Sequence, residues 1–243
     1  EIGVRLVGSE MCIRDRIYDL ASEFNAMADR LQTTEEARRR FVSDASHELK
    51  TPLAGIRLLS DSILQTENMD AQTVREFVGD IEQESERLAR ITENLLRLTR
   101  LDSGALPEAQ EVDIAAVIAR VVRMLRLVAE EKQVDLSYEV RREGKTLASE
   151  DELNEIIYNL TENAIKYNRP GGFVRVALAG DEETCLLTVS DNGIGIPAED
   201  MPRIFDRFYR VDKARSRESG GTGLGLSIAR EIVQRHHGTI SLV

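Results

Sequence analysis

The stretch FVSDASHELKTPL, residues 41–53, has its apolar residues at the spacing of an α-helix. They are Phe41, Val42, Ala45, Leu49 and Leu53, and Ile56 continues the same face. His47 falls almost opposite this face, between a serine and a glutamate and shortly before a proline. The stretch therefore predicts a helix that buries one side and exposes a histidine on the other.

The helical pattern extends upstream and recurs downstream. Upstream, apolar residues alternate at the three- and four-residue intervals of a coiled-coil seam, at Ile17, Leu20, Phe24, Met27 and Leu31. Downstream, a second helix has a heptad pattern broken only at Glu84, with apolar residues at Val74, Phe77, Ile81, Leu88, Ile91, Leu95 and Leu98. The two helices, joined around QTENMDAQ, predict a hairpin. Because one hairpin has too little core to stand alone, we expect two to pair as a dimeric four-helix bundle.

The pattern changes after LDSGALPEAQEVD, which ends the second helix and has the composition of a linker. Helices are predicted over residues 114–130, 150–167 and 224–235. Strands are predicted at VDLSYEV, FVRVALAG, CLLTVSD and TISLV, and the middle two form an antiparallel hairpin. This order predicts an α+β sandwich, with helices on one face of a mixed sheet.

Composition excludes several classes of protein. The net charge of −11 is opposite to that of a nucleic-acid-binding surface, so no nucleic-acid partner is expected. Cys12 and Cys185 are far apart and have no metal-ligand spacing, so neither a disulfide framework nor a zinc site is expected. No apolar run approaches the length of a membrane span, and the N-terminus has no signal-peptide core, so we expect a soluble chain.

The neighbours of His47 indicate chemistry. An exposed histidine alone needs no functional explanation. Here, however, the carboxylate of Glu48 can orient the imidazole and take its proton, which makes the ring a nucleophile. Pro52 deprives the Glu48 carbonyl of its helical partner, so we expect the helix to be loosened or bent there. Thr51 lies one turn beyond the histidine on the same face.

The helix ELNEIIYNLTENAIKY, residues 152–167, has a polar stripe beside its apolar one. The polar stripe contains Glu155, Asn159, Asn163 and Lys166. An amide oxygen can bind Mg²⁺ without adding negative charge beside a polyphosphate, and a lysine can offset phosphate charge directly. By itself the stripe could equally be a solvated helix face.

Two glycine-rich segments follow this helix. In DNGIGIP, Gly193 and Gly195 permit a tight turn, and Asp191 offers a carboxylate that, if buried, would select adenine by its exocyclic amine. By itself this segment could be a hairpin turn. GGTGLGLSIAR places glycines just before a helix, where backbone amides and the helix N-terminus can receive phosphate. The three elements in this order predict a nucleotide site.

From about Ile17 onward, the chain resembles a bacterial sensor histidine kinase of a two-component system. DRIYDLASEFNAMADRLQ resembles the last helix of a HAMP signal-relay domain, and FVSDASHELKTPL resembles the phosphoacceptor box. NLTENAIKY, DNGIGIP, IFDRFYR and GGTGLGLSIAR resemble the N, first glycine, F and second glycine boxes of the catalytic domain. The resemblance implies a Bergerat-type ATPase fold.

The resemblance also implies roles for individual residues. His47 is implied as the phosphoacceptor, Glu48 as its base and Thr51 as the residue used in dephosphorylating the partner. Asn159 and Asn163 match the magnesium and phosphate positions. The remaining implied nucleotide contacts are Lys166, Tyr167, Asp191, Gly193, Gly195, Gly221, Gly223, Gly225 and the lid arginine Arg210, for which Arg207 is a close competitor.

The implied activity is autophosphorylation of His47 by ATP with Mg²⁺, followed by transfer to an aspartate of a response regulator. Phosphatase activity toward that regulator and homodimerisation are also implied. The expected domains are a HAMP-like helix at 17–34, a dimerisation and phosphotransfer domain at 35–103, a linker at 104–111 and a catalytic ATP-binding domain at 112–243. Residues 1–16 continue no periodicity and are expected to be non-native or unassigned.

Two departures from the family pattern bear on the extent of the chain. No sensor or transmembrane segment precedes the HAMP-like helix, and the last strand usual in the family is missing after Val243. We therefore expect a fragment, truncated at the C-terminus, that is the cytoplasmic portion of a cell-membrane protein.

Two other classes of function remain open. One is an ATPase of the same fold that drives a conformational clamp, which would bind ATP but form no phosphohistidine. The other is a dimeric scaffold with a dead nucleotide site, which would not bind ATP.

Overall fold

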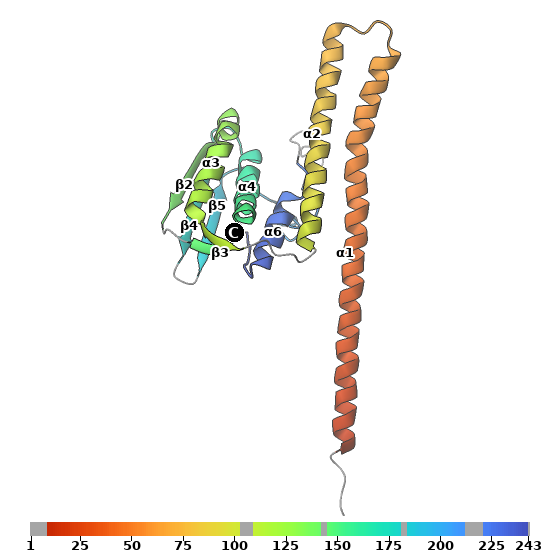
Figure 1. Cartoon of the computed structure of the whole chain (residues 1–243), viewed down its shortest axis with the longest axis vertical. Coiled ribbons are helices and arrows are strands. Elements are labelled where there is room, and N and C mark those ends of the chain that lie inside the picture. The colour runs from red at the N-terminus through yellow and green to blue at the C-terminus, as the bar shows by residue number, and fades with distance from the viewer. Residues whose placement is uncertain (1–8, 103–108, 142–144, 181–183, 212–220, 243) are drawn as a thin grey trace, which may run out of the picture. The chain divides into compact units, whose positions relative to one another are not determined.

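The computed structural model describes residues 9–102, 109–141, 145–180, 184–211 and 221–242 (Figure 1). The described residues do not include 1–8, most of the expected linker (103–108) or the segment 212–220. For residues 9–17 only the backbone is described. The chain divides into two units, residues 1–50 and 51–243, and each is described by itself. The division falls beside Pro52.

The first unit is helical. It contains most of α1, Ser9–Gln65. This helix begins within residues 1–16, for which the sequence predicted no helical pattern. The predicted seam residues Leu20, Phe24, Met27 and Leu31 are all more than half exposed in this single chain. Apolar side chains in such a row are stabilised only when another surface covers them.

The second unit begins with the end of α1 and its connection to α2, Ala71–Asp102. Helix α1 continues through Pro52 without interruption. Asp70 caps α2, because its Oδ1 accepts hydrogen bonds from the backbone N–H groups of Gln72 and Thr73 at 2.9 and 3.0 Å. The hydrogen bond from the Thr73 hydroxyl, together with these backbone contacts, lowers the pKa of the Asp70 carboxyl. The predicted helical hairpin is therefore present.

The break in the heptad pattern at Glu84 has a local explanation. Glu84 lies 3.7 Å from Arg87, which is itself buried. Across from it, a Cβ added at Gly55 of α1 would lie 3.9 Å from the Glu84 side chain. The charged residue is thus accommodated by a cation on its own helix and a small residue on the facing one.

Residues 112–243, the expected catalytic domain, form the predicted α+β sandwich where they are described. Two helices pack on one sheet. The helices are α3, Ile114–Glu131, and α4, Glu150–Lys166. The strands of the sheet are β2, Asp135–Val140, β4, Phe173–Gly180, and β5, Cys185–Asp191. Strand β2 pairs with β4 in parallel, and β4 pairs with β5 antiparallel, so the sheet is mixed as expected. Helix α6, Gly225–Arg235, contacts α4.

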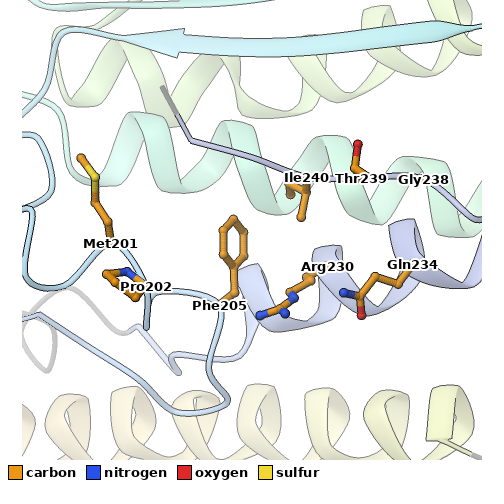
Figure 2. Close-up of a pocket in the computed structure, with 8 residues that line it drawn as sticks. All are labelled: Met201, Pro202, Phe205, Arg230, Gln234, Gly238, Thr239 and Ile240. Atoms are coloured by element: carbon orange, nitrogen blue, oxygen red, sulfur yellow. The ribbon is translucent and has the colours of Figure 1, made fainter.

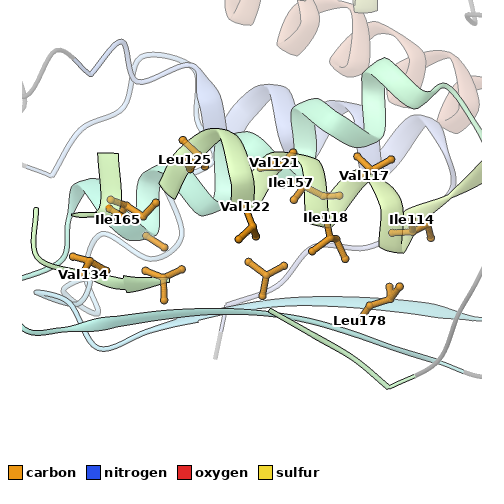
Figure 3. Packing of buried hydrophobic residues seen from close by; sticks show 14 of the residues in the cluster. Ile114, Val117, Ile118, Val121, Val122, Leu125, Val134, Ile157, Ile165 and Leu178 are labelled. Atoms are coloured by element: carbon orange, nitrogen blue, oxygen red, sulfur yellow. The ribbon is translucent and has the colours of Figure 1, made fainter. Parts of the chain in front are cut away.

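The core lies between α3, α4 and the sheet (Figure 3). Side chains of α3 with little or no exposed surface face Val174, Val176 and Leu178 of β4, and these alternate with exposed or half-exposed residues along the strand. Asp113 caps α3 by accepting the N–H groups of Ala115 and Ala116. Because the buried residues of α3, α4 and β4 pack in one core, the position of α4 against the sheet is fixed.

One predicted strand is absent, and one pair of strands was not predicted. Residues 239–242, within TISLV, are not in a strand, and no described residue pairs with them. An alternating pattern supplies two faces, but a strand is stable only when a neighbour satisfies its backbone groups. In addition, β1, Gln110–Asp113, begins within the expected linker and pairs antiparallel with β3, Lys145–Ala148, in a separate two-stranded sheet.

Candidate functional site

The predicted polar stripe of helix α4 lies beside both glycine-rich segments. Three of the glycines lie where added side chains would collide with it. A Cβ on Gly225 would lie 2.8 Å from Asn159 Oδ1, and one on Gly221 would lie 2.7 Å from Lys166 Nζ. One on Gly193 would lie 2.5 Å from the carbonyl oxygen of Tyr167. The structure therefore brings together residues that are far apart in the sequence.

The first glycine-rich segment is fastened to the C-terminal end of α4. Gly193 N–H donates to Asp191 Oδ1 at 2.8 Å, and Ile194 N–H donates to the Tyr167 carbonyl at 3.1 Å. Gly195 has a φ of 71°, which glycine adopts without strain. Asp191 is exposed, so the burial on which adenine selection was made conditional is not present in this structure, and its role toward adenine stays a prediction. It is the last residue of β5, where the strand enters the loop.

Arg169 also holds this segment, and sequence reasoning missed it. Its guanidinium donates to the carbonyls of Asn192 at 3.1 Å and Gly193 at 2.8 Å. A five-donor guanidinium that bridges two consecutive carbonyls fixes the loop against the helix end.

The second glycine-rich segment meets the F-box segment. Phe208 N–H donates to the Gly223 carbonyl at 2.9 Å, and a Cβ on Gly223 would lie 2.9 Å from the Phe208 backbone. Gly223 has a φ of 71°. Leu224 and Gly225 then begin α6, so the segment ends in a helix N-terminus as predicted.

The cationic groups of the site lie close enough to affect one another. Burial lowers the pKa of Lys166 to about 8, with Arg210 and Lys132 adding to the effect and Glu162 opposing it. Lys166 also lies 5.6 Å from the centre of the Tyr167 ring. Arg207, the competitor for the lid role, instead forms a fork with Asp102 of α2 at 2.7 and 3.0 Å. Of the two arginines, Arg210 is the one whose charge affects Lys166.

Asn163 lies one turn after Asn159 on α4 and is partly buried. Its backbone carbonyl accepts a hydrogen bond from the backbone N–H of Tyr167 at 3.0 Å, at the C-terminal end of the helix. Both amides therefore lie on the turns of α4 that precede Lys166. Such a position allows their oxygens to face a shared ligand.

Glu155, one turn before Asn159, is buried, and its pKa is raised to about 7. Burial is the main cause. Arg97 of α2 opposes it by an ion pair, and a hydrogen bond from Asn159 also lowers the pKa. Sequence reasoning placed Glu155 in the polar stripe but gave it no role, because a long-range partner such as Arg97 has no sequence signal.

The predicted phosphoacceptor residues lie on α1. His47 is exposed, as the helical pattern predicted, while Glu48 is partly buried and Thr51 is exposed. His47 and Glu48 belong to the first unit, and Thr51 begins the second.

A separate cavity of about 330 Å³ lies beside α6 (Figure 2). It is lined by Met201, Pro202, Phe205, Arg230, Gln234, Gly238, Thr239 and Ile240. None of the residues predicted to bind nucleotide lines it, so we do not assign it to the site.

No helix among the described residues is long and apolar enough to cross a membrane.

The close approach at Gly193 yields a stability prediction. Gly193→Ala should destabilise the chain by about 1–3 kcal/mol, because the new methyl group would overlap the Tyr167 carbonyl in a packed segment. Gly79→Ala is the control: no atom lies within 4 Å of its added Cβ, and alanine should stabilise α2 by up to about 1 kcal/mol. Denaturant unfolding of both variants checks this. Equal stability of Gly193→Ala and wild type would show that the loop is not held against α4.

Comparison with known proteins agrees with this architecture. Residues 37–104 match the His Kinase A phospho-acceptor domain family, and residues 148–243 match the family of histidine kinase-, DNA gyrase B- and HSP90-like ATPases. The "Sensor-like histidine kinase SenX3" of Mycolicibacterium smegmatis is 37% identical over 209 residues, which cover 86% of this chain and 54% of the relative. The chain thus spans about half the length of this relative.

Solved structures show the same fold. Full-length ShkA in complex with AMPPNP is 25% identical, with a TM-score of 0.58 over 78% of this chain and 39% of that one. Histidine kinase ThkA in complex with response regulator protein TrrA is 20% identical, with a TM-score of 0.62 over 98% of this chain and 62% of that one. With both domain families matched in the expected order, the chain belongs to the bacterial sensor histidine kinases of two-component systems.

Proposed function

We propose that the chain is the kinase portion of a sensor protein, which uses ATP to phosphorylate His47 and passes the phosphoryl group to an aspartate of a response regulator. The observation that carries the proposal is the meeting of Asn159, Lys166 and Tyr167 with both glycine-rich segments, in a chain that also exposes a histidine followed by a glutamate. The matched ATPase family supports the use of ATP.

The proposed reaction is an in-line phosphoryl transfer. An imidazole nitrogen of His47 forms a bond to the γ-phosphorus as the bond to the β,γ-bridging oxygen breaks, and ADP leaves. Glu48 takes the imidazole proton. Lys166 and Arg210 offset the negative charge that spreads over the transferring group. The product is a phosphoramidate, which can transfer its phosphoryl group onward.

The residues present suit a bound Mg²⁺ ion. Within the described ranges, no three His, Cys, Asp or Glu side chains are arranged to hold a metal. The donors would instead be the amide oxygens of Asn163 and Asn159 together with the nucleotide's phosphates, since Mg²⁺ takes oxygen ligands and shares them with substrate phosphates. Side chains at Gly221 and Gly225 would intrude on this space. When bound, Mg²⁺ would supply charge neutralisation at the phosphates.

Partners follow from the same proposal. The ThkA structure contains a response regulator, and we extend such a partner to this chain. Two chains would pair through their hairpins. The exposed α1 residues Leu20, Phe24, Met27 and Leu31, which precede the hairpin, would be covered by the partner chain in a coiled coil. We further propose that the chain is the cytoplasmic portion of a membrane-anchored protein, which rests on the family resemblance.

The proposal is tested by incubating the chain with Mg²⁺ and γ-labelled ATP, then adding a purified receiver domain. The label should appear first on the chain and then on the receiver. ATP binding without any label on the chain would favour a conformational-clamp ATPase. Failure to bind ATP would favour the dead-site scaffold.

Thr51→Ala should separate two activities. The nucleophile His47 and its base Glu48 remain in place, so autophosphorylation should continue at close to the wild-type rate. Removal of phosphate from the regulator should fail, because the implied role of Thr51 lies in that step. Rates of both reactions are measured on the same preparation. Equal loss of both activities would mean that Thr51 acts structurally beside Pro52.

A further inference from the structure

Glu155 is a buried carboxylate for which the proposed reaction has no use. It is 7% exposed and lies on α4 one turn before Asn159. A buried carboxylate is costly unless it is paired or hydrogen-bonded. Glu155 has both kinds of partner: Arg97 of α2 forms an ion pair with it, and the side chain of Asn159 forms a hydrogen bond to it.

The hydrogen bond determines which end of the Asn159 amide faces Glu155. The Oδ1 atom of Asn159 lies beside Gly225, so the NH₂ group is the end of the amide that is left to donate to the Glu155 carboxyl group. The amide oxygen then points elsewhere. It lies 2.8 Å from the place that a Cβ on Gly225 would occupy, at the first residue of α6 and next to the second glycine-rich segment. That oxygen is the atom of Asn159 that can bind Mg²⁺.

Arg97 connects this arrangement to α2, the second helix of the hairpin. Among the described residues, two further polar contacts join the last turns of α2 to the catalytic-domain region. Asn94 Nδ2 donates to Thr222 Oγ1 at 3.3 Å, and Asp102 accepts the fork from Arg207. Between these contacts, Leu98 and Leu101 of α2 are buried. Each polar contact ends on a different segment of the predicted nucleotide site.

We propose that Glu155 is a positioning residue that turns the oxygen of Asn159 toward the metal-nucleotide complex, and that Arg97 holds Glu155 in place when α2 is docked. Docking of α2 and binding of the metal-nucleotide complex are then coupled through one buried carboxylate. This inference rests on the proposed function, because it takes the same site to bind ATP with Mg²⁺.

The coupling is tested by nucleotide affinity rather than by turnover. The dissociation constant of a non-hydrolysable ATP analogue is measured calorimetrically on the whole chain, once with Mg²⁺ and once with EDTA. Glu155→Gln and Arg97→Ala should reduce the enhancement of affinity by Mg²⁺ by about 10-fold, as is typical when a residue that orients a metal ligand is changed. Affinity in EDTA should stay within about twofold of wild type, since Asn159 then has no metal to bind.

Three further variants sharpen the test. Arg97→Lys keeps the charge and should restore most of the enhancement. Arg75→Ala removes an exposed arginine elsewhere on α2 and should leave it unchanged. The Glu155→Gln, Arg97→Ala double variant should lose no more than the more impaired single variant, because both act through one contact.

Several results would overturn the inference. One is an unchanged Mg²⁺ enhancement in both single variants. Another is an equal loss of affinity with and without Mg²⁺, which would show that Glu155 and Arg97 only stabilise the fold. If wild type labels on His47 while the variants keep their enhancement, only this inference fails. If wild type binds no nucleotide, the proposed function fails with it.

Discussion

Replacing His47 with alanine should abolish phosphorylation of the chain by ATP. The alanine removes the only imidazole in the predicted phosphoacceptor stretch, and with it the nitrogen proposed to accept the phosphoryl group. The measurement is incorporation of γ-labelled phosphate in the presence of Mg²⁺. In wild type the label should be lost in acid and retained in base, as expected for a phosphoramidate.

Ser43→Ala is the matched control for this result. Ser43 lies one turn before His47 on the same helix and is also exposed. Its removal should leave labelling unchanged. Full labelling of His47→Ala would show that another residue accepts the phosphoryl group and that the interpretation of FVSDASHELKTPL is wrong.

Asn163→Ala should lower the rate of autophosphorylation by orders of magnitude. The substitution removes an amide oxygen proposed to bind Mg²⁺, and the ion neutralises charge on the transferring phosphoryl group. The initial rate of labelling at saturating ATP measures the effect. Circular dichroism should show that the variant remains folded, because Asn163 is only partly buried.

Asn154→Ala is the control on the same helix. Nine residues separate it from Asn163, which places it on the opposite face of α4 at roughly 100° per residue. It should retain close to the wild-type rate. A rate for Asn163→Ala within about twofold of wild type would contradict its assignment as a metal ligand, because losing such a ligand costs much more.

The helices were predictable because each buries a continuous face. The spacing placed α3 at 114–130, and the observed helix ends one residue later. The predicted helix at 150–167 is observed as α4 with its last residue at Lys166. Periodicity reports burial, and burial is what stabilises these elements.

The short strands were not predictable in the same way. β1 and β3 have four residues each and are separated by more than 30 positions, so the pairing that stabilises them leaves no local pattern. TISLV presents the converse case. Its alternation resembles a strand, but pairing depends on a neighbour that the letters themselves do not specify.

In the candidate site, too, local patterns were predictable and long-range contacts were not. Short-range motifs indicated Asn159, Lys166 and the glycines, because those residues follow one another along a helix or a turn. Contacts between distant segments were missed, including the Arg169 bridge to the Asn192 and Gly193 carbonyls and the pair between Arg97 and Glu155. These contacts exist only once α2, α4 and the first glycine-rich segment have packed together.

The central claim is that His47 itself carries the phosphoryl group, and the sequence allows a direct measurement. Trypsin cleaves after Arg40 and Lys50 and so releases FVSDASHELK, which contains His47 together with Ser43, Asp44 and Ser46. After incubation with ATP and Mg²⁺, fragmentation mass spectrometry of this peptide under neutral conditions should place one phosphoryl group on His47. A phosphoryl group on either serine or on Asp44, or a peptide that stays unmodified while the chain is labelled elsewhere, would contradict the account.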